Sequence, residues 1–430
     1  MFRLVLRNTG WNLLGSVLPA VAAIVAVPIL LERLGVGRFG MLSLAWVVVG
    51  YFGLFDFGLG RAITRSVARC SADQDEAHLA RVCATGSALI GVLALCVGGL
   101  VLTASPLIGS FLIRQSPDLE SELLRATPML AFGVLAVVFS AAPRGILEGR
   151  QEFRLLSLVR TPIGIASYLV PCLVTQFEPR LDTTVLSVVI VRAIGTLALL
   201  MACARRVPFS MDAVSASEIR PLVTFGGWLT VSTIISPLLA YADRFVIVSI
   251  LGAEKFAYYS VPSDMVSRML LVPGALVAAL YPAISGAGSR DPSMGRMLRR
   301  RALFLVTAVV GAAVVLVQVG AEPLLRLWLG QEFARNSAIV LQILLVGLMA
   351  NALAYVWSTA LQGEGRSREI ALLHLAQLPI YLVAVSLMTN AYGVVGAAVA
   401  WTGRLILDAL GLYLILHFRE QAHRRLVLAA

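Results

Sequence analysis

The chain has 430 residues, of which 59% are hydrophobic and only 14% are charged. A soluble domain carries about a quarter charged residues, and no soluble fold has enough interior for this much apolar side chain. The net charge of +11 comes without any basic region outside the apolar segments, which argues against nucleic acid as a partner. Five scattered cysteines and four unpaired histidines form no ligand cluster, so no metal or other cofactor is expected.

Apolar runs long enough to cross a bilayer, about 20 residues each, recur twelve times in the chain. They lie at 11–31, 39–60, 82–104, 126–143, 155–175, 184–203, 221–250, 257–284, 302–320, 337–360, 370–389 and 394–417. The interruptions between them are short and leave no room for an extramembrane domain. The predicted fold is therefore an all-α polytopic membrane protein with about twelve spanning helices.

The basic residues give these helices a direction, since cytoplasmic loops are enriched in arginine and lysine. With the N-terminus placed in the cytoplasm and the helices alternating, 22 of the 35 basic residues fall on the inner side. Eight fall on the outer side, and five arginines remain within helices. This skew predicts an even number of spans with both termini in the cytoplasm.

An internal repeat divides the twelve helices into six and six. At an offset of 217 residues, Gly10-Trp11 matches Gly227-Trp228, Leu34-Gly35 matches Leu251-Gly252, Arg38-Phe39 matches Lys255-Phe256, and Pro106 matches Pro323. At an offset of 216, Glu148-Gly149-Arg150 matches Glu364-Gly365-Arg366. The predicted lobes are 1–206 and 221–430, joined by a cytoplasmic linker at 207–220. Transporters built from such parallel repeats place the substrate path between the halves, so the repeat indicates transport.

The repeat also explains a match to the dinucleotide-binding pattern GxGxxG at 35–40. A nucleotide site needs a preceding strand within a βαβ unit, whereas a spanning helix precedes this segment. The second copy reads Gly-Ala-Glu-Lys-Phe-Ala at 252–257. We therefore interpret 35–40 as a tight turn between two helices.

Charged and polar residues inside the membrane are costly and usually face a cavity or a partner. The arginines exceed the aspartates there, and guanidinium binds phosphate in a fork geometry, so a cavity for an anion is expected. The candidate cavity residues are Arg192, Arg268, Arg404, Arg244, Arg61, Arg65 and Asn12. Asp56, Asp243, Asp264 and Asp408 serve either ion coupling or charge pairing, and the sequence leaves both open.

Simpler roles remain open for several of these residues. Asp264 with Arg268, and Arg404 with Asp408, are spaced to form self-neutralising i,i+4 pairs. Arg160 lies about two turns from the inner surface, where its side chain can reach the interface. The ridge of Arg61, Arg65 and Arg69 also fits a topology signal with lipid headgroup contact. The charged outer segment near 105–125 is interpreted as a solvated turn.

At this point the sequence resembles a known family. Asp243-Arg244-Phe245-Val246-Ile247, Leu251-Gly252, Tyr258-Tyr259-Ser260-Val261-Pro262 and Tyr281-Pro282 resemble the second lobe of bacterial polysaccharide and O-antigen flippases. The first-lobe series Pro28, Leu34-Gly35, Phe39-Gly40 and Asp56-Phe57-Gly58-Leu59-Gly60 resembles the same family. These proteins belong to the multidrug/oligosaccharidyl-lipid/polysaccharide (MOP) exporter superfamily, and the resemblance covers essentially the whole chain.

The resemblance implies two six-helix lobes in a MATE-like V in the bacterial inner membrane. It implies flipping of an undecaprenyl-pyrophosphate-linked oligosaccharide to the outer leaflet by alternating access, with basic cavity residues for the pyrophosphate. Implied partners are the lipid-linked substrate, membrane lipids, and a polysaccharide polymerase with other assembly proteins. Three alternatives are a multidrug exporter, a peptidoglycan-precursor flippase and a membrane glycan polymerase or ligase. A multidrug exporter would need a dominant carboxylate in one lobe, for which Asp56 alone is a weak candidate. Peptidoglycan-precursor flippases typically have fourteen helices, and a polymerase or ligase would need a nucleophile–base pair, which the external segment near 105–125 does not offer.

Overall fold

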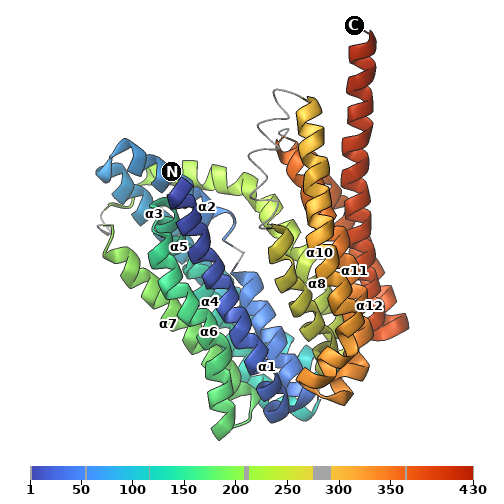
Figure 1. The fold of residues 1–430 in the computed structure, drawn as a ribbon. Coiled ribbons are helices and arrows are strands. Elements are labelled where there is room, and N and C mark those ends of the chain that lie inside the picture. Colours follow the sequence, from blue (N-terminus) through green and yellow to red (C-terminus); the bar gives the residue numbers. More distant parts are fainter. Residues whose placement is uncertain are drawn as a thin grey trace. The chain divides into compact units, whose positions relative to one another are not determined.

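The fold was analysed in a computed structural model that describes residues 2–53, 56–115, 117–207, 213–274, 292–363 and 366–429. Every regular element in these ranges is a helix (Figure 1). The helices are α1 (Phe2–Phe52), α2 (Leu59–Asp73), α3 (Glu76–Gln115), the short 3₁₀ helix η1 (Pro117–Leu119), α4 (Glu120–Phe139), α5 (Ala141–Gly149), α6 (Phe153–Phe177), α7 (Leu181–Ala204), α8 (Ala216–Met269), α10 (Pro292–Leu329), α11 (Gln331–Gly363) and α12 (Ser367–Ala429).

Within the described ranges, eight helices are long and apolar enough to cross a membrane. Many of their large apolar side chains are exposed, among them Phe177 (88%), Leu316 (75%) and Leu327 (90%). A soluble surface rarely carries apolar area on this scale, so these faces are the ones that lipid covers. The prediction of an all-α, multi-pass membrane protein is confirmed, while the count of twelve spans stays a prediction.

Three long helices are each interrupted by one glycine whose backbone is not helical. These are Gly35 in α1, Gly252 in α8 and Gly393 in α12. All three fall between two predicted spans of the sequence. Gly35 has φ 74° and ψ 166°, and Gly252, 217 residues later, has φ 79° and ψ 177°. Only glycine adopts this region without strain, so the motif at 35–40 is a reversal between helices.

The repeat is visible in the helix boundaries as well. The ends of α1 and α8, Phe52 and Met269, are also 217 residues apart. Pro106 lies inside α3, and its match Pro323 lies inside α10. The stretch that would match α2 lies at 276–290, outside the described residues. The two halves therefore share helix order and kink positions in the parts that can be compared.

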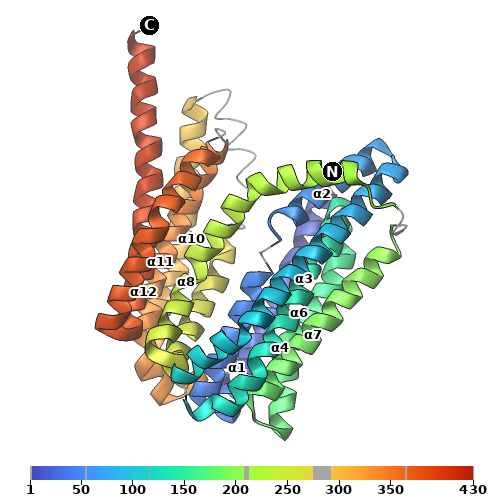
Figure 2. The ribbon, with the colours of Figure 1, turned by 180° about the vertical axis from the view of Figure 1, so that it is seen from behind.

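Contacts divide the chain into two units. Unit 1 comprises Met1–Pro237 with Gly252–Glu254, and unit 2 comprises Leu238–Leu251 with Lys255–Ala430. The start of α8, including the end of the proposed linker, thus groups with unit 1. Leu222 of α8 is buried in an apolar cluster with residues of α2, α3 and α5, and the backbone N–H of Ser215 donates to Thr85 Oγ1 at 3.0 Å. The two views show this segment beside α2 (Figures 1 and 2).

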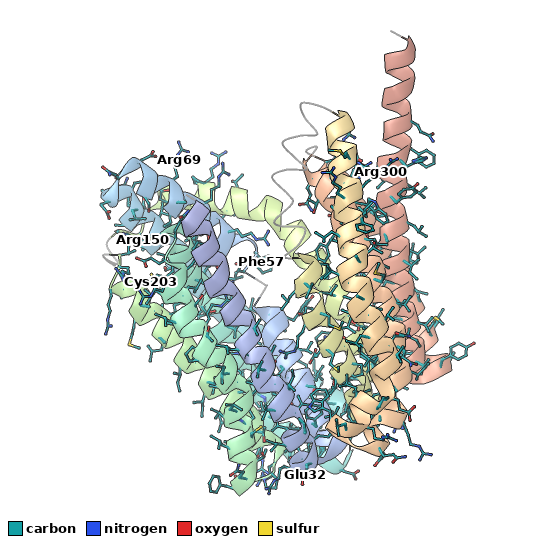
Figure 3. The ribbon with its side chains drawn as sticks, viewed as in Figure 1. Glu32, Phe57, Arg69, Arg150, Cys203 and Arg300 are labelled. Carbon is teal, nitrogen blue, oxygen red and sulfur yellow. The ribbon has the colours of Figure 1, made fainter. Side chains whose placement is uncertain are left out.

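Within unit 1, α6 and α7 pack against each other, α1 packs against α6, and α4 packs against α3 and α7. The unit has two distinct ends. Arg69, Arg150 and Cys203 lie at one end, and Glu32 lies at the opposite end (Figure 3). In unit 2, α11 packs against both α10 and α12. Each unit is thus a helical bundle in its own right.

The second predicted span, 39–60, is too long. Helix α1 ends at Phe52, the chain bends through Phe57 (φ 49°) and Gly58 (φ 72°), and α2 begins at Leu59. Gly60 and Gly145 allow α2 to lie directly on α5, because a Cβ on Gly145 would stand 2.7 Å from the Gly60 carbonyl oxygen. The motif at 56–60 therefore marks a bend and a close helix contact.

Candidate binding cavity

A cavity of about 270 Å³ lies inside unit 1, where α1, α4, α5, α6 and α7 meet. Three arginines line it: Arg144 from α5, Arg160 from α6 and Arg192 from α7. The remaining lining residues are small, apolar or hydroxyl-bearing: Gly15, Pro19, Val49, Gly50, Gly53, Val137, Ser140, Val159, Ile163, Gly164, Gly195, Thr196 and Leu199. Among its described lining residues, the wall thus carries three positive charges and no carboxylate.

The three arginines lie at different depths. Arg192 is at the middle of α7, about 16 Å from the start of that helix and about 18 Å from its end at 1.5 Å per residue. Arg160 is about 10 Å along α6 from Phe153, and Arg144 lies in α5, just past the break at Ser140. Arg160 is within electrostatic reach of both Arg144 and Arg192. Positive charge therefore runs from the arginine-rich end of unit 1 to its middle.

Protein carboxylates compensate these charges only in part, since Glu148 of α5 acts electrostatically on Arg160 without forming an ion pair with it. Among the described residues, no carboxylate lies within ion-pair distance of Arg144, Arg160 or Arg192. Arg192 Nε is buried and has no hydrogen-bond partner there. An arginine at the centre of a spanning helix costs about 2.5–3.5 kcal/mol even on scales that allow for relaxation. An unpaired arginine at this depth is therefore best explained by an anion that it binds.

Small residues bring the helices around the cavity close together. A Cβ on Gly164 would stand 2.6 Å from the Pro19 ring, and a Cβ on Gly195 would stand 2.9 Å from Ile163. The Thr196 hydroxyl, which also lines the cavity, donates to the Ala136 carbonyl at 2.8 Å and so ties α7 to α4. Small residues at such interfaces allow membrane helices to approach closely, which fixes the arginines against a rigid wall.

The aspartate before α2 has a structural role. Asp56 is buried, and its two carboxylate oxygens accept hydrogen bonds from the backbone N–H groups of Gly58 (3.0 Å) and Gly60 (3.2 Å). It thereby satisfies donors at the start of α2, as an N-terminal capping carboxylate does. This contact is neither of the two roles that the sequence left open for Asp56, ion coupling or charge pairing.

The ridge on α2 lies on the solvent-facing side of an amphipathic helix. Arg61, Arg65 and Arg69 are exposed, while the opposite face of α2 is buried in the apolar cluster through Ala62, Ile63, Val67 and Cys70. Arg61 and Arg65 do not line the arginine cavity. The structure therefore separates these two predicted cavity residues from Arg192.

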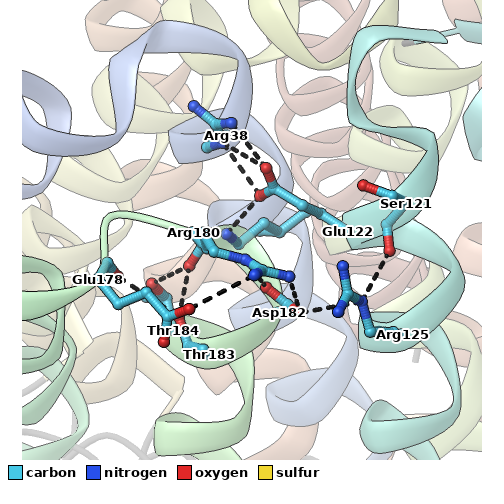
Figure 4. Close-up of polar contacts among 10 residues, drawn as sticks. Arg38, Ser121, Glu122, Arg125, Glu178, Arg180, Asp182, Thr183 and Thr184 are labelled. Carbon is cyan, nitrogen blue, oxygen red and sulfur yellow. Dashed lines mark hydrogen bonds and ion pairs between the residues drawn. The ribbon is translucent and has the colours of Figure 1, made fainter.

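The opposite end of unit 1 holds a network of ion pairs that the sequence did not indicate (Figure 4). Arg38 Nη2 lies 2.6 Å from Glu122 Oε1, and the other Glu122 oxygen accepts a hydrogen bond from the backbone N–H of Leu181. Glu122 is only 7% exposed, so interpreting this segment as a solvated turn was wrong for Glu122. Nearby, Asp182 pairs with Arg180 (2.8 Å) and Arg125 (3.2 Å). These contacts tie the segment of α1 just after the Gly35 kink to the starts of α4 and α7.

In unit 2, the predicted candidates Asp243, Arg244 and Asp264 lie together on α8. Asp243 is fully buried and accepts a hydrogen bond from the Tyr259 hydroxyl. Arg244, 4% exposed, lies 2.9 Å from Asp264 Oδ1, and its guanidinium stacks over the Tyr241 ring. Asp264 thus pairs with Arg244, a partner that its i,i+4 spacing to Arg268 did not suggest. The charged side chains of this cluster therefore interact with groups inside the protein.

The expected Arg404–Asp408 pair is not among the ion pairs of the described residues. Arg404 instead lies over the Tyr381 ring, 5.3 Å from its centroid. Asp408 Oδ1 lies 3.2 Å from His374 Nε2 and accepts a hydrogen bond from Gln377 at 3.2 Å. In a spanning helix, stacking on an aromatic ring stabilises the Arg404 guanidinium more than exposure to lipid would. Asp408 therefore links the two arms of α12 on either side of Gly393.

Arg268 and Asn12 are the two remaining predicted cavity residues. Arg268 is half-buried near the end of α8. The side chain of Asn12 lies outside the described residues. The structure adds Arg144, which directly follows the predicted span 126–143, and Arg160, whose side chain was expected to reach the interface. Their spacing along the chain carries no signal for a shared site, because each comes from a different helix.

Comparison with known proteins identifies the family. The family model described as "Polysaccharide biosynthesis protein" matches residues 5–287. A relative from Shigella flexneri named "Putative O-antigen transporter" is 30% identical over 412 residues, which cover 94% of this chain and 96% of the relative. The relatives are transporters and flippases, not enzymes, which confirms the prediction of a transporter.

Solved structures show the fold. A multidrug resistance MATE family transporter of the MOP superfamily, in an inward-facing conformation, matches with a TM-score of 0.81 at 16% identity and covers 95% of this chain and 96% of its own. The lipid II flippase MurJ matches with a TM-score of 0.69 at 13% identity and covers 94% and 88%. The MATE-like fold expected from the sequence is confirmed, and the chain is a membrane transporter that belongs to the polysaccharide biosynthesis protein family.

Proposed function

We propose that the protein flips a polyprenyl-pyrophosphate-linked oligosaccharide from the cytoplasmic to the outer leaflet of the bacterial inner membrane. The observation that carries the proposal is the cavity of unit 1, whose described lining presents Arg144, Arg160 and Arg192 and no carboxylate. A pyrophosphate offers oxygens on two linked phosphates, and guanidinium groups bind such oxygens in pairs. A cavity for hydrophobic cations would need the opposite charge.

The depth of the arginines supports a path across the membrane. In the proposed orientation, with both termini in the cytoplasm, the arginine-rich end of unit 1 faces inward. Arg144 and Arg160 then meet the headgroup first, and Arg192 holds it near the middle of the bilayer. The pyrophosphate would exchange water for guanidinium contacts in steps, while the polyprenyl tail stays in lipid. Alternating access of the two lobes would complete the transfer, and a polymerase in the outer leaflet would receive the product.

The proposal is tested by deleting the gene and measuring surface polysaccharide together with lipid-linked repeat units. We expect surface polysaccharide to disappear and undecaprenyl-pyrophosphate-linked oligosaccharide to accumulate on the cytoplasmic side. Complementation with the wild-type gene restores both. Normal polysaccharide in the deletion strain, accompanied by changed drug tolerance, would contradict the proposal and favour a multidrug exporter.

A further inference from the structure

A second cavity of unit 1, with a volume of about 320 Å³, lies between the ends of α6 and α7. Its wall is apolar and is formed by Leu155, Val159, Ala198, Met201 and Ala202. Two further lining residues, Arg205 and Arg206, follow directly after the last residue of α7. The combination is an apolar groove with two guanidinium groups at one end, which we name the α6–α7 groove.

The groove is continuous with a face of α7 that is suited to lipid. Ile190, Ile194, Leu197 and Met201 are exposed by 48%, 55%, 56% and 50%, respectively. Their spacing of three and four residues places them along one side of the helix. This stripe leads directly to the groove at Met201, so the groove is open to the hydrocarbon region of a membrane.

The two arginines stand where a lipid headgroup would be. Arg205 and Arg206 are exposed and lie beyond the helix end, about 18 Å along the axis from Arg192. Arg206 Nη1 is 3.7 Å from Glu152 Oε1, longer than the 2.7–2.9 Å of a charge-assisted hydrogen bond. Within the described residues Arg205 has no ion-pair partner. Arg205 is thus available to an anion at the membrane surface, and the long ion pair to Glu152 engages Arg206 only weakly.

We propose that the α6–α7 groove binds an anionic phospholipid of the cytoplasmic leaflet. One acyl chain lies on Leu155, Val159 and Met201, and the phosphate is held by Arg205 and Arg206. Basic pockets between helices on the cytoplasmic side suit such headgroups. A resident phospholipid fits better than the transported lipid, because its phosphate stays at the surface, whereas Arg192 lies at mid-membrane. The inference rests on the orientation adopted in the proposed function.

The bound lipid would support the neighbouring cavity. Val159 lines both the α6–α7 groove and the arginine cavity, and Arg160 is the next residue along α6. An acyl chain packed on Val159 therefore buttresses the wall that presents Arg160. The site is thus a lipid contact through which membrane composition can act on the cavity.

The test is native mass spectrometry of the full-length protein in mild detergent, titrated with phosphatidylglycerol, phosphatidylcholine or undecaprenyl phosphate. We compare wild type with R205Q/R206Q, which removes the headgroup contact, and with Met201→Trp, which fills the groove at an exposed position. The matched control is R300Q/R301Q, which removes two adjacent exposed arginines from unit 2.

We expect wild type to prefer phosphatidylglycerol over phosphatidylcholine. R205Q/R206Q should weaken phosphatidylglycerol binding about tenfold or more, Met201→Trp should weaken binding of both phospholipids, and the control should bind as wild type does.

Three results would overturn the inference. The first is unchanged phosphatidylglycerol binding in both groove variants, and the second is an equal loss in R300Q/R301Q, which would indicate non-specific attraction. The third is binding of undecaprenyl phosphate that depends on Arg205 and Arg206 more strongly than phosphatidylglycerol does, which would assign the groove to the transported lipid. Because lipid binding is measured without transport, its failure leaves the flippase proposal intact, and a failure of flipping leaves the binding result intact.

Discussion

The two sequence halves share helix order and the glycine kinks at Gly35 and Gly252, yet the buried charges of unit 1 and unit 2 have different partners. In unit 1, Arg144, Arg160 and Arg192 lie on a cavity wall whose described residues include no carboxylate. In unit 2, Arg244 has a carboxylate partner in Asp264, and Asp243 accepts a hydrogen bond from Tyr259, although Arg244 Nε and Asp243 Oδ1 have no hydrogen-bond partner among the described residues. A repeated scaffold thus carries two different polar interiors. The difference indicates that unit 1 provides binding chemistry and that the unit 2 cluster provides stability.

The largest effect is expected at Asp243. Replacing it in Asp243→Ala leaves the Tyr259 hydroxyl without its acceptor and the neighbouring Arg244 with less negative charge in a fully buried place. Breaking a buried charged cluster costs about 3–5 kcal/mol. We expect a strong loss of folded protein, measured by thermal unfolding in detergent with fluorescence-detected size exclusion. Asp73→Ala, at a position exposed by 66%, is the control. Equal stability of both variants would remove the proposed role of the unit 2 cluster.

Arg192→Gln should produce the opposite profile, with function lost and stability kept. The substitution removes an unpaired buried cation, so the melting temperature should stay unchanged or rise. Loss of a charge-assisted contact to substrate costs about 1.5–3 kcal/mol, so polysaccharide export in a complemented deletion strain should fall roughly tenfold or more. Arg300→Gln, an exposed position in unit 2, serves as the control. Full export by Arg192→Gln at normal protein levels would contradict the proposed cavity role.

A smaller effect is expected at the ion-pair network of unit 1. Glu122→Gln keeps the shape of the side chain but replaces the charged contact to Arg38 with a neutral one. The loss of a charge-assisted hydrogen bond is worth about 1.5–3 kcal/mol, reduced here because Arg38 is partly exposed. We expect a lower melting temperature than for Glu120→Gln, whose carboxylate is exposed. If the two variants melt together, the network does not stabilise unit 1.

The smallest effect tests the shared scaffold directly. Gly35→Ala and Gly252→Ala each place a Cβ on backbone that only glycine adopts without strain, at a cost of about 1–3 kcal/mol. Because the two positions are equivalent in the repeat, we expect similar drops in melting temperature. Gly37→Ala, with open space around it and no positive φ, is the control. A large difference between Gly35→Ala and Gly252→Ala would show that the kinks are not equivalent.

Prediction from sequence succeeded where only one residue type can meet the physical requirement of a position. Gly35 and Gly252 marked the helix reversals, because glycine alone tolerates that backbone. It missed the contact between Asp264 and Arg244, because the i,i+4 rule considers one continuous helix and Arg244 lies across the kink at Gly252. Glu122 was assigned to a solvated turn, since nothing in its own segment indicates that Arg38 and the N–H of Leu181 reach it.

The sequence by itself determined that this is a membrane protein of two related halves, because apolar length, arginine asymmetry and a constant offset can all be measured along the chain. It also indicated that arginines, more than carboxylates, occupy the membrane interior. Only the tertiary structure decided which arginines act together. Arg144, Arg160 and Arg192 come from three helices, and close packing at Gly164 and Gly195 sets them around one cavity. Contacts between helices depend on packing in three dimensions, which leaves no periodic trace in the sequence.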